Sequence, residues 1–131
     1  MYAMVTISRK EFEDMVNRVV AQLPPDYLAR LKNVAILVKD QPDLDQRQKL
    51  MLRANQTLFG LYEGVPLSQR QGTVKLLPDK ITVFQKPLEH ASENINDLFK
   101  NIGKTVWHEV AHYFGLNHEQ IRELERKEKL N

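Results

Sequence analysis

The feature that most constrains how this chain folds is an eleven-residue run from His108 to His118, H-E-V-A-H-Y-F-G-L-N-H. It combines histidines at its first, fifth and last positions with a glutamate and a glycine at fixed places between them. Residues four apart on an α-helix share one face about one turn apart, so His108 and His112 can reach a single cation. The run therefore predicts a helix from about Ile95 to Gly115 that carries both side chains.

The same run predicts a sharp end to that helix at Gly115. If the helix continued, His118 would lie ~9 Å further along the axis than His112 and on another side. Glycine is the residue that most readily adopts the left-handed conformation that ends helices. Asn117 is then expected to be the N-cap of a last helix, with Gln120 at its third position. We therefore expect His118 to turn back toward the other two histidines.

Three imidazoles in this arrangement indicate a zinc site. Neutral imidazole is a good zinc ligand, and catalytic zinc sites keep one open position for water. We expect His108, His112 and His118 to bind Zn²⁺, although three imidazoles also accept other divalent ions. Glu109 lies roughly 100° around the helix from His108. We expect it to hold the metal-bound water molecule rather than to take the place of that water on the metal. Since zinc lowers the pKa of that water toward ~7, Glu109 is the candidate general base.

Less specific interpretations of these residues stay open. Histidines four apart on a helix are, without further pattern, ordinary surface or core residues, and Glu109 is then a surface carboxylate. The remaining histidine, His90, stands alone outside the run and is interpreted as structural or exposed.

The composition predicts one globular domain spanning residues 1–131, large enough to bury roughly two-thirds of its unfolded surface. The net charge of +2 comes from 19 basic and 17 acidic residues that are interspersed, and no basic stripe indicates a nucleic-acid partner. No apolar run approaches the ~18 residues of a membrane span. No signal-like segment is visible, and the count of cysteines is 0. We therefore expect a cytoplasmic protein without a membrane or nucleic-acid partner, and a monomer is compatible with these features.

The hydrophobic pattern predicts an α+β fold. Ser8 and Glu11 form a capping box that opens an amphipathic helix from about Arg9 to Leu23. The short β-branched run Asn33–Lys39 predicts a buried strand. Thr73–Leu77 and Lys80–Lys86 flank a Pro-Asp turn and predict a hairpin, whose second strand is expected at an edge of the sheet.

Between these elements the pattern is less specific. Asp40–Asp45 predicts a solvated loop, and Gln46–Phe59 fits either a helix or extended chain. Gly60 and Gly64 predict turns or a close approach of the backbone to a neighbour. Pro87–Glu93 predicts one or two helical turns. This order of elements predicts a small mixed sheet with helices packed on one side.

The histidine run resembles that of the zincin metallopeptidases, and its third histidine and glycine are spaced as in the metzincins. The chain departs from metzincins because no methionine follows His118, and from gluzincins because no distant glutamate follows the run. A closer resemblance is to small bacterial zincin-like proteins, carried by Leu58–Leu67, Pro78–Phe84 and the run itself. That resemblance covers most of Leu28 to Leu124. It implies a minimal zincin fold and a zinc metallopeptidase whose physiological substrate is not established.

The resemblance also implies where substrate binds. In zincins the substrate backbone pairs with an edge strand above the active-site helix. The strand around Thr82 to Gln85, with Thr82, Val83 and Phe84, is the candidate for that role here. A donor outside the helix steadies the oxyanion in such sites, and Tyr62 and Arg70 are the candidates.

The leading hypothesis is therefore a zinc-dependent peptidase that acts on a peptide or protein substrate, with Glu109 as general base. One alternative is a zinc-binding protein without catalysis, in which the metal organises the fold or a docking surface. Another is a metal-dependent endoribonuclease, because a bacterial family involved in ribosomal RNA maturation shares the histidine spacing. That family lacks the glutamate found here at position 109.

Overall fold

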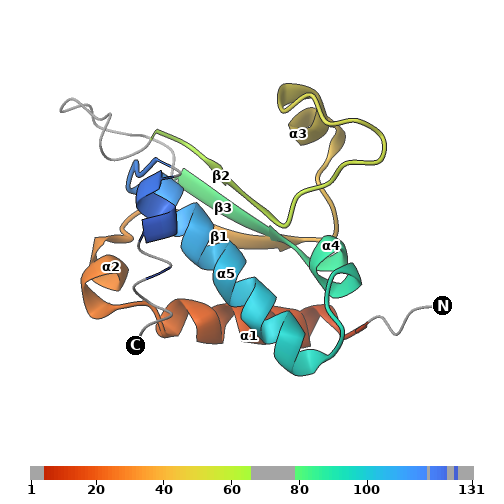
Figure 1. Cartoon of the computed structure of the whole chain (residues 1–131), viewed down its shortest axis with the longest axis horizontal. Coiled ribbons are helices and arrows are strands. Elements are labelled where there is room, and N and C mark those ends of the chain that lie inside the picture. Colours follow the sequence, from red (N-terminus) through yellow and green to blue (C-terminus); the bar gives the residue numbers. More distant parts are fainter. Residues whose placement is uncertain (1–4, 66–78, 118, 124–125, 127–131) are drawn as a thin grey trace.

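The computed structural model describes residues 5–65, 79–117, 119–123 and 126 of the chain. The helices and strands follow the order predicted for an α+β domain (Figure 1). They are α1 (Arg9–Ala21), α2 (Pro25–Arg30), β1 (Val34–Lys39), α3 (Leu44–Lys49), β2 (Gly60–Glu63), β3 (Asp79–Phe84), α4 (Gln85–His90) and α5 (Ile95–Tyr113). Residues 119–123 are also helical.

Helix α1 begins where the capping box predicts it. The Ser8 side chain accepts the Glu11 backbone N–H, and the Glu11 side chain accepts the Ser8 backbone N–H, both at 3.0 Å. These bonds satisfy two backbone donors that the helix itself leaves without partners. The apolar stripe of α1 is buried and packs against α5.

The three strands form a mixed sheet with the order β1-β3-β2. Strand β3 is parallel to β1 and antiparallel to β2, so it is hydrogen-bonded along both of its edges. The prediction that this strand lies at the sheet edge is therefore wrong. Thr82, Val83 and Phe84 are 1%, 0% and 0% exposed, because they belong to the central strand. The predicted partner arm, Thr73–Leu77, lies outside the described residues.

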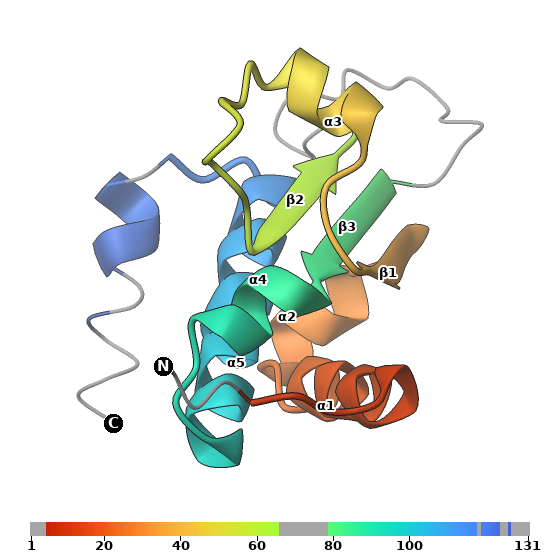
Figure 2. The same ribbon diagram turned by 90° about the vertical axis from the view of Figure 1, so that its right-hand side faces the viewer.

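Helices α1 and α5 lie on the same side of the sheet, and α3 lies on the opposite side from α1 (Figures 1 and 2). The core fills the space between these two helices and β3. Its fully buried members include Phe12, Ile81, Val83, Leu88, Leu98, Ile102, Val106 and Val110. Each such side chain contributes about 1.5–3 kcal/mol by leaving water, so this layer holds α5 firmly in place.

Two local predictions need correction, and one helix was missed. The loop predicted for Asp40–Asp45 ends early, because Asp43 and Gln46 form a second capping box that starts α3 at Leu44. Strand β3 ends at Phe84 rather than Lys86, because α4 begins at Gln85 and includes Pro87 in its first turn. Helix α2 was not predicted, although Pro25 at its first position is a common helix-start signal.

No helix in the part of the chain that the structure describes combines the length and the apolar character that crossing a membrane requires.

Candidate metal centre

Helix α5 carries the candidate site on its last turns. The helix is capped by Asn94, whose side chain accepts the Asp97 backbone N–H at 2.8 Å. It spans 19 residues, so the segment that bears the histidines is fixed by the packed core turns before it. The predicted helix and its two-histidine face are thus both present.

The predicted end of the helix is confirmed. Gly115 has a φ of 82°, which is the left-handed conformation. Its N–H donates to the His112 carbonyl at 2.9 Å, and the Leu116 N–H donates to the Ala111 carbonyl at 3.1 Å. This pair of bonds is the Schellman motif, which satisfies the last carbonyls of a helix.

The next helix begins as predicted as well. The Asn117 side chain accepts the Gln120 N–H at 2.8 Å, and the Gln120 side chain accepts the Asn117 N–H at 2.9 Å. His118 itself lies outside the described residues, so its role as third metal ligand stays a prediction.

The two helix histidines converge. His108 Nε2 and His112 Nε2 lie 3.1 Å apart, and both belong to a cluster with the Glu109 carboxylate. The ligand atoms of this cluster all lie within 4.8 Å of one another. Two zinc–nitrogen bonds of ~2.0–2.1 Å at a tetrahedral angle place their nitrogens about 3.3 Å apart. The observed separation therefore fits two imidazoles that share one zinc ion.

Glu109 is buried beside these histidines, with 8% of its surface exposed. Burial raises the pKa of its carboxyl to about 7, and the hydrogen bond from the Tyr62 backbone N–H opposes that shift. That bond reaches Glu109 Oε1 at 2.9 Å and fixes one carboxylate oxygen. A general base works best when its pKa lies near the working pH, so this environment suits proton transfer close to neutrality.

Strand β2 approaches α5 closely enough to make that bond because residue 60 is a glycine. A Cβ atom at Gly60 would lie 2.6 Å from Thr105 Cγ2 and 3.3 Å from Glu109 Cγ. The predicted close backbone approach at this glycine is therefore confirmed.

The pairing of β2 with β3 explains why the Tyr62 N–H points toward the helix. The Phe84 N–H donates to the Phe59 carbonyl, and the register pairs Gly60 with Val83 and Tyr62 with Ile81. Antiparallel pairs alternate between hydrogen-bonded and non-hydrogen-bonded, so the backbone groups of Gly60 and Tyr62 face away from β3. The outer edge of β2 thus faces the candidate site.

A cavity of about 320 Å³ lies at this edge. It is lined by Leu58, Phe59, Gly60, Lys104, Thr105, His108 and Glu109. Lys104 was missed from the sequence, although it precedes His108 by four residues and therefore shares its helix face.

Comparison with known proteins agrees with this architecture. The family model of zincin-like metallopeptidases matches residues 31–128. The chain belongs to this family. Its confirmed features are those that a zincin-like domain requires, namely the small α+β fold and the histidine pair on a helix.

A solved structure shares the fold of this zincin-like chain. It is a conserved hypothetical protein from Thermus thermophilus, with a TM-score of 0.57 and 18% sequence identity. The alignment covers 82% of this chain and 94% of that one. At this identity the match shows the fold alone. A search of curated proteins finds no match to this zincin-like chain.

Tyr62 and Arg70 are the two residues predicted to donate to the oxyanion in this zincin-like site. The Tyr62 hydroxyl donates to Asp79 Oδ2 at 2.7 Å, so its proton is held by a fully buried carboxylate. The residue contacts the site through its backbone N–H instead, which no side-chain pattern reveals. Arg70 lies outside the described residues, and its role stays a prediction.

Proposed function

We propose that this zincin-like protein is a zinc-dependent peptidase, in which His108 and His112 hold the metal with His118 and Glu109 is the general base. The observation that carries the proposal is the convergence of two imidazole nitrogens, 3.1 Å apart, with the buried carboxylate of Glu109 beside them. All three groups lie on the helix segment next to one strand edge.

The donor set fits zinc, since imidazole nitrogens at this spacing match its preferred geometry. When bound, Zn²⁺ supplies Lewis-acid chemistry that polarises a carbonyl group and makes water a nucleophile near neutral pH. The remaining chemistry belongs to the protein's own side chains.

Glu109 moves the proton in this mechanism. One of its oxygens is fixed by the Tyr62 N–H, which orients the carboxylate and leaves the other oxygen to accept a proton. That oxygen takes a proton from water as the water attacks the peptide carbonyl. It then delivers the proton to the departing amine nitrogen when the carbon–nitrogen bond breaks. One carboxylate thus serves both halves of the hydrolysis.

Strand β2 replaces Thr82–Phe84 as the strand that we propose binds substrate. Its outer edge faces the cavity at Gly60, where an extended peptide adds to the sheet by backbone hydrogen bonds. Lys104 lines the same cavity and is a donor outside the metal ligands, so we assign it to the developing oxyanion.

The decisive experiment is Glu109→Gln, which keeps the size of the side chain but removes the base. We expect zinc content, read by elemental mass spectrometry, to stay stoichiometric. Cleavage of a peptide library should fall by about 10²–10⁴-fold, the usual contribution of a general base. Glu93→Gln is the matched control, since Glu93 is an exposed carboxylate beyond the other end of α5. A Glu109→Gln variant that cleaves as fast as the native protein would show that Glu109 is not the base.

The third ligand is tested separately by His118→Ala. We expect this variant to lose stoichiometric zinc while it stays folded, because the buried core that the structure describes is formed mainly by residues of α1, β3, α4 and α5. Unchanged zinc content would remove His118 from the ligand set. A native protein that holds zinc firmly but cuts no peptide would instead support a non-catalytic zinc-binding role.

A further inference from the structure

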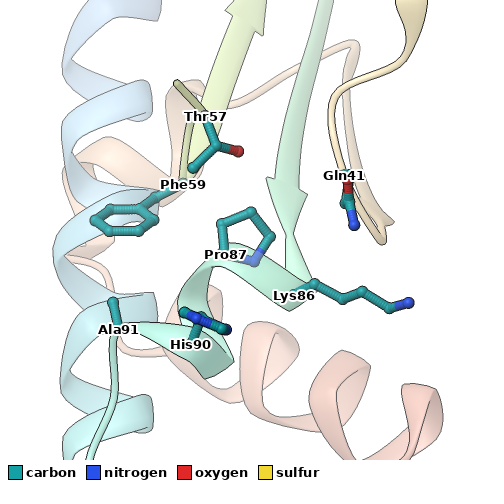
Figure 3. Close-up of a pocket in the computed structure, with 7 residues that line it drawn as sticks. All are labelled: Gln41, Thr57, Phe59, Lys86, Pro87, His90 and Ala91. Atoms are coloured by element: carbon teal, nitrogen blue, oxygen red, sulfur yellow. The ribbon is translucent and has the colours of Figure 1, made fainter. Parts of the chain in front are cut away.

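A second cavity, of about 410 Å³, adjoins the one at the metal centre. Phe59 lines both cavities, so the two adjoin at this residue. Figure 3 shows the second cavity, with Phe59 and Thr57 on the chain before β2 and Lys86, Pro87 and His90 on α4. The two cavities therefore form neighbouring compartments along one side of the molecule.

The lining of the second cavity combines apolar and basic groups. Phe59, Pro87 and Ala91 supply apolar surface, and Lys86 and His90 supply an ammonium group and an imidazole. No acidic side chain is among the described residues that line it.

The nearest acidic side chains in the sequence are engaged elsewhere. Asp40, beside Gln41 of the lining, forms an ion pair with Arg9. Glu89 on α4 is 9% exposed and accepts hydrogen bonds from the Ile7 N–H and the Gln85 side chain. Neither carboxylate is among the residues that line the cavity.

We propose that this second cavity is a substrate subsite that selects an acidic side chain, Asp or Glu, on the peptide that the metal centre cleaves. The inference rests on the proposed peptidase function. Because the two cavities share Phe59, the selected residue lies within a few positions of the scissile bond. The Lys86 side chain, which extends away from Phe59 and His90 in Figure 3, binds its carboxylate at that end of the cavity.

The binding experiment uses the Glu109→Gln variant loaded with zinc and two fluorescein-labelled peptides that differ only by Glu or Gln at one position. That position is moved in turn over three residues on each side of the peptide's centre. We expect the Glu peptide to bind about fivefold tighter at one position, the size of a single exposed charge pair. Lys86→Gln should abolish that preference, and Lys86→Glu should reverse it.

Lys32→Glu is the matched control, because it makes the same charge change at an exposed lysine that lines neither cavity. It should leave the preference for Glu unchanged. In parallel, cleavage of a proteome-derived peptide library by the native protein should enrich Asp and Glu at the same position. Lys86→Glu should remove that enrichment.

The outcomes separate this inference from the peptidase proposal. Equal binding of Glu and Gln peptides at every position, or a preference that survives Lys86→Glu, would overturn the acidic subsite. Cleavage without acidic enrichment would also overturn it while leaving the peptidase intact. Binding that favours Glu through Lys86, in a native protein that cuts no peptide, would keep the subsite and discard the catalysis.

Discussion

The two halves of helix α5 use the same buried stripe for opposite purposes. In the first half, Leu98 and Ile102 are fully buried and pack in the apolar core. In the second half, Glu109 follows Ile102 by seven residues, which is two helical turns, and so occupies the same face. It is almost as buried, yet it carries an ionisable group.

The difference lies in what each half packs against. The first half contributes Leu98 and Ile102 to the same apolar cluster as Phe12 of α1, where burial of any methyl group is favourable. The second half meets the outer edge of β2, where the Tyr62 N–H offers a hydrogen bond to a carboxylate. A buried carboxyl costs free energy unless it is neutralised or hydrogen-bonded, and this edge provides only part of that compensation. The packing of the first half thus stabilises the helix enough to keep the Glu109 carboxyl buried in the second half, although that burial costs free energy.

The largest effect on stability is expected from Ile102→Ala in the first half. Removing a fully buried isoleucine side chain leaves a cavity, so the free energy of unfolding should fall by about 2–5 kcal/mol. Urea denaturation measures this loss. Zinc affinity of the folded protein should change little, because no ligand lies on those turns. Weak zinc binding by the folded variant would show that the two halves are not separable.

The next largest effect is a dependence of folding stability on pH, which arises from Glu109 in the second half of α5. In protein treated with a chelator, the pKa of Glu109 rises from 4.5 when unfolded to about 7 when folded, because burial disfavours its charge. The folded state therefore binds one proton more than the unfolded state between these values. Its contribution to stability is full below pH 4.5 and is lost as pH rises toward about 7.

The expected loss is on the order of 3 kcal/mol, and thermal or urea unfolding across that pH range measures it. Glu109→Gln has no titrating group at this position, so its stability should decline less over the same range. An identical pH profile in both proteins would contradict the assignment of the raised pKa to Glu109.

A smaller effect is expected where β2 meets the helix. Gly60→Ala places a methyl group 2.6 Å from Thr105 Cγ2 and 3.2 Å from the Thr82 carbonyl oxygen, so β2 must move away from α5. Overpacking of this kind costs about 1–3 kcal/mol. The shift also withdraws the Tyr62 N–H from Glu109, so peptide cleavage should fall more than stability alone explains. Full activity in this variant would show that the bond to Tyr62 is dispensable.

The smallest expected effect has the opposite sign and is the control for the previous one. Gly103 lies inside α5, and a Cβ atom there meets nothing within 4 Å. Gly103→Ala should therefore stabilise the helix by about 0.5–1 kcal/mol without changing activity. Gly103→Ala thus measures the effect of backbone entropy alone, whereas Gly60→Ala also measures the close approach of β2 to α5. Destabilisation by Gly103→Ala would mean that the first half of α5 is also packed tightly at this position.

Sequence patterns predicted the local elements that depend on neighbouring residues. The capping box at Ser8, the helix end at Gly115 and the cap at Asn117 are confirmed, because each depends on bonds between residues close in the chain. The histidine pair is confirmed for the same reason, since helical spacing alone brings both rings together. The order of strands was not predictable in this way. The alternation of residues in 80–86 suggested an edge strand, whereas two distant strands cover both of its edges.

By itself, the sequence determined that His108, Glu109 and His112 share one helix that ends at Gly115, because helical geometry and glycine's conformational freedom are local properties. Only the tertiary structure decided what that helix faces. It brought the outer edge of β2 against Glu109, with the Tyr62 N–H in contact across 47 positions of sequence. It also placed the cavity beside α4 next to the candidate metal centre. Those contacts arise because strand pairing and core packing join segments whose separation in the chain carries no signal of their proximity in space.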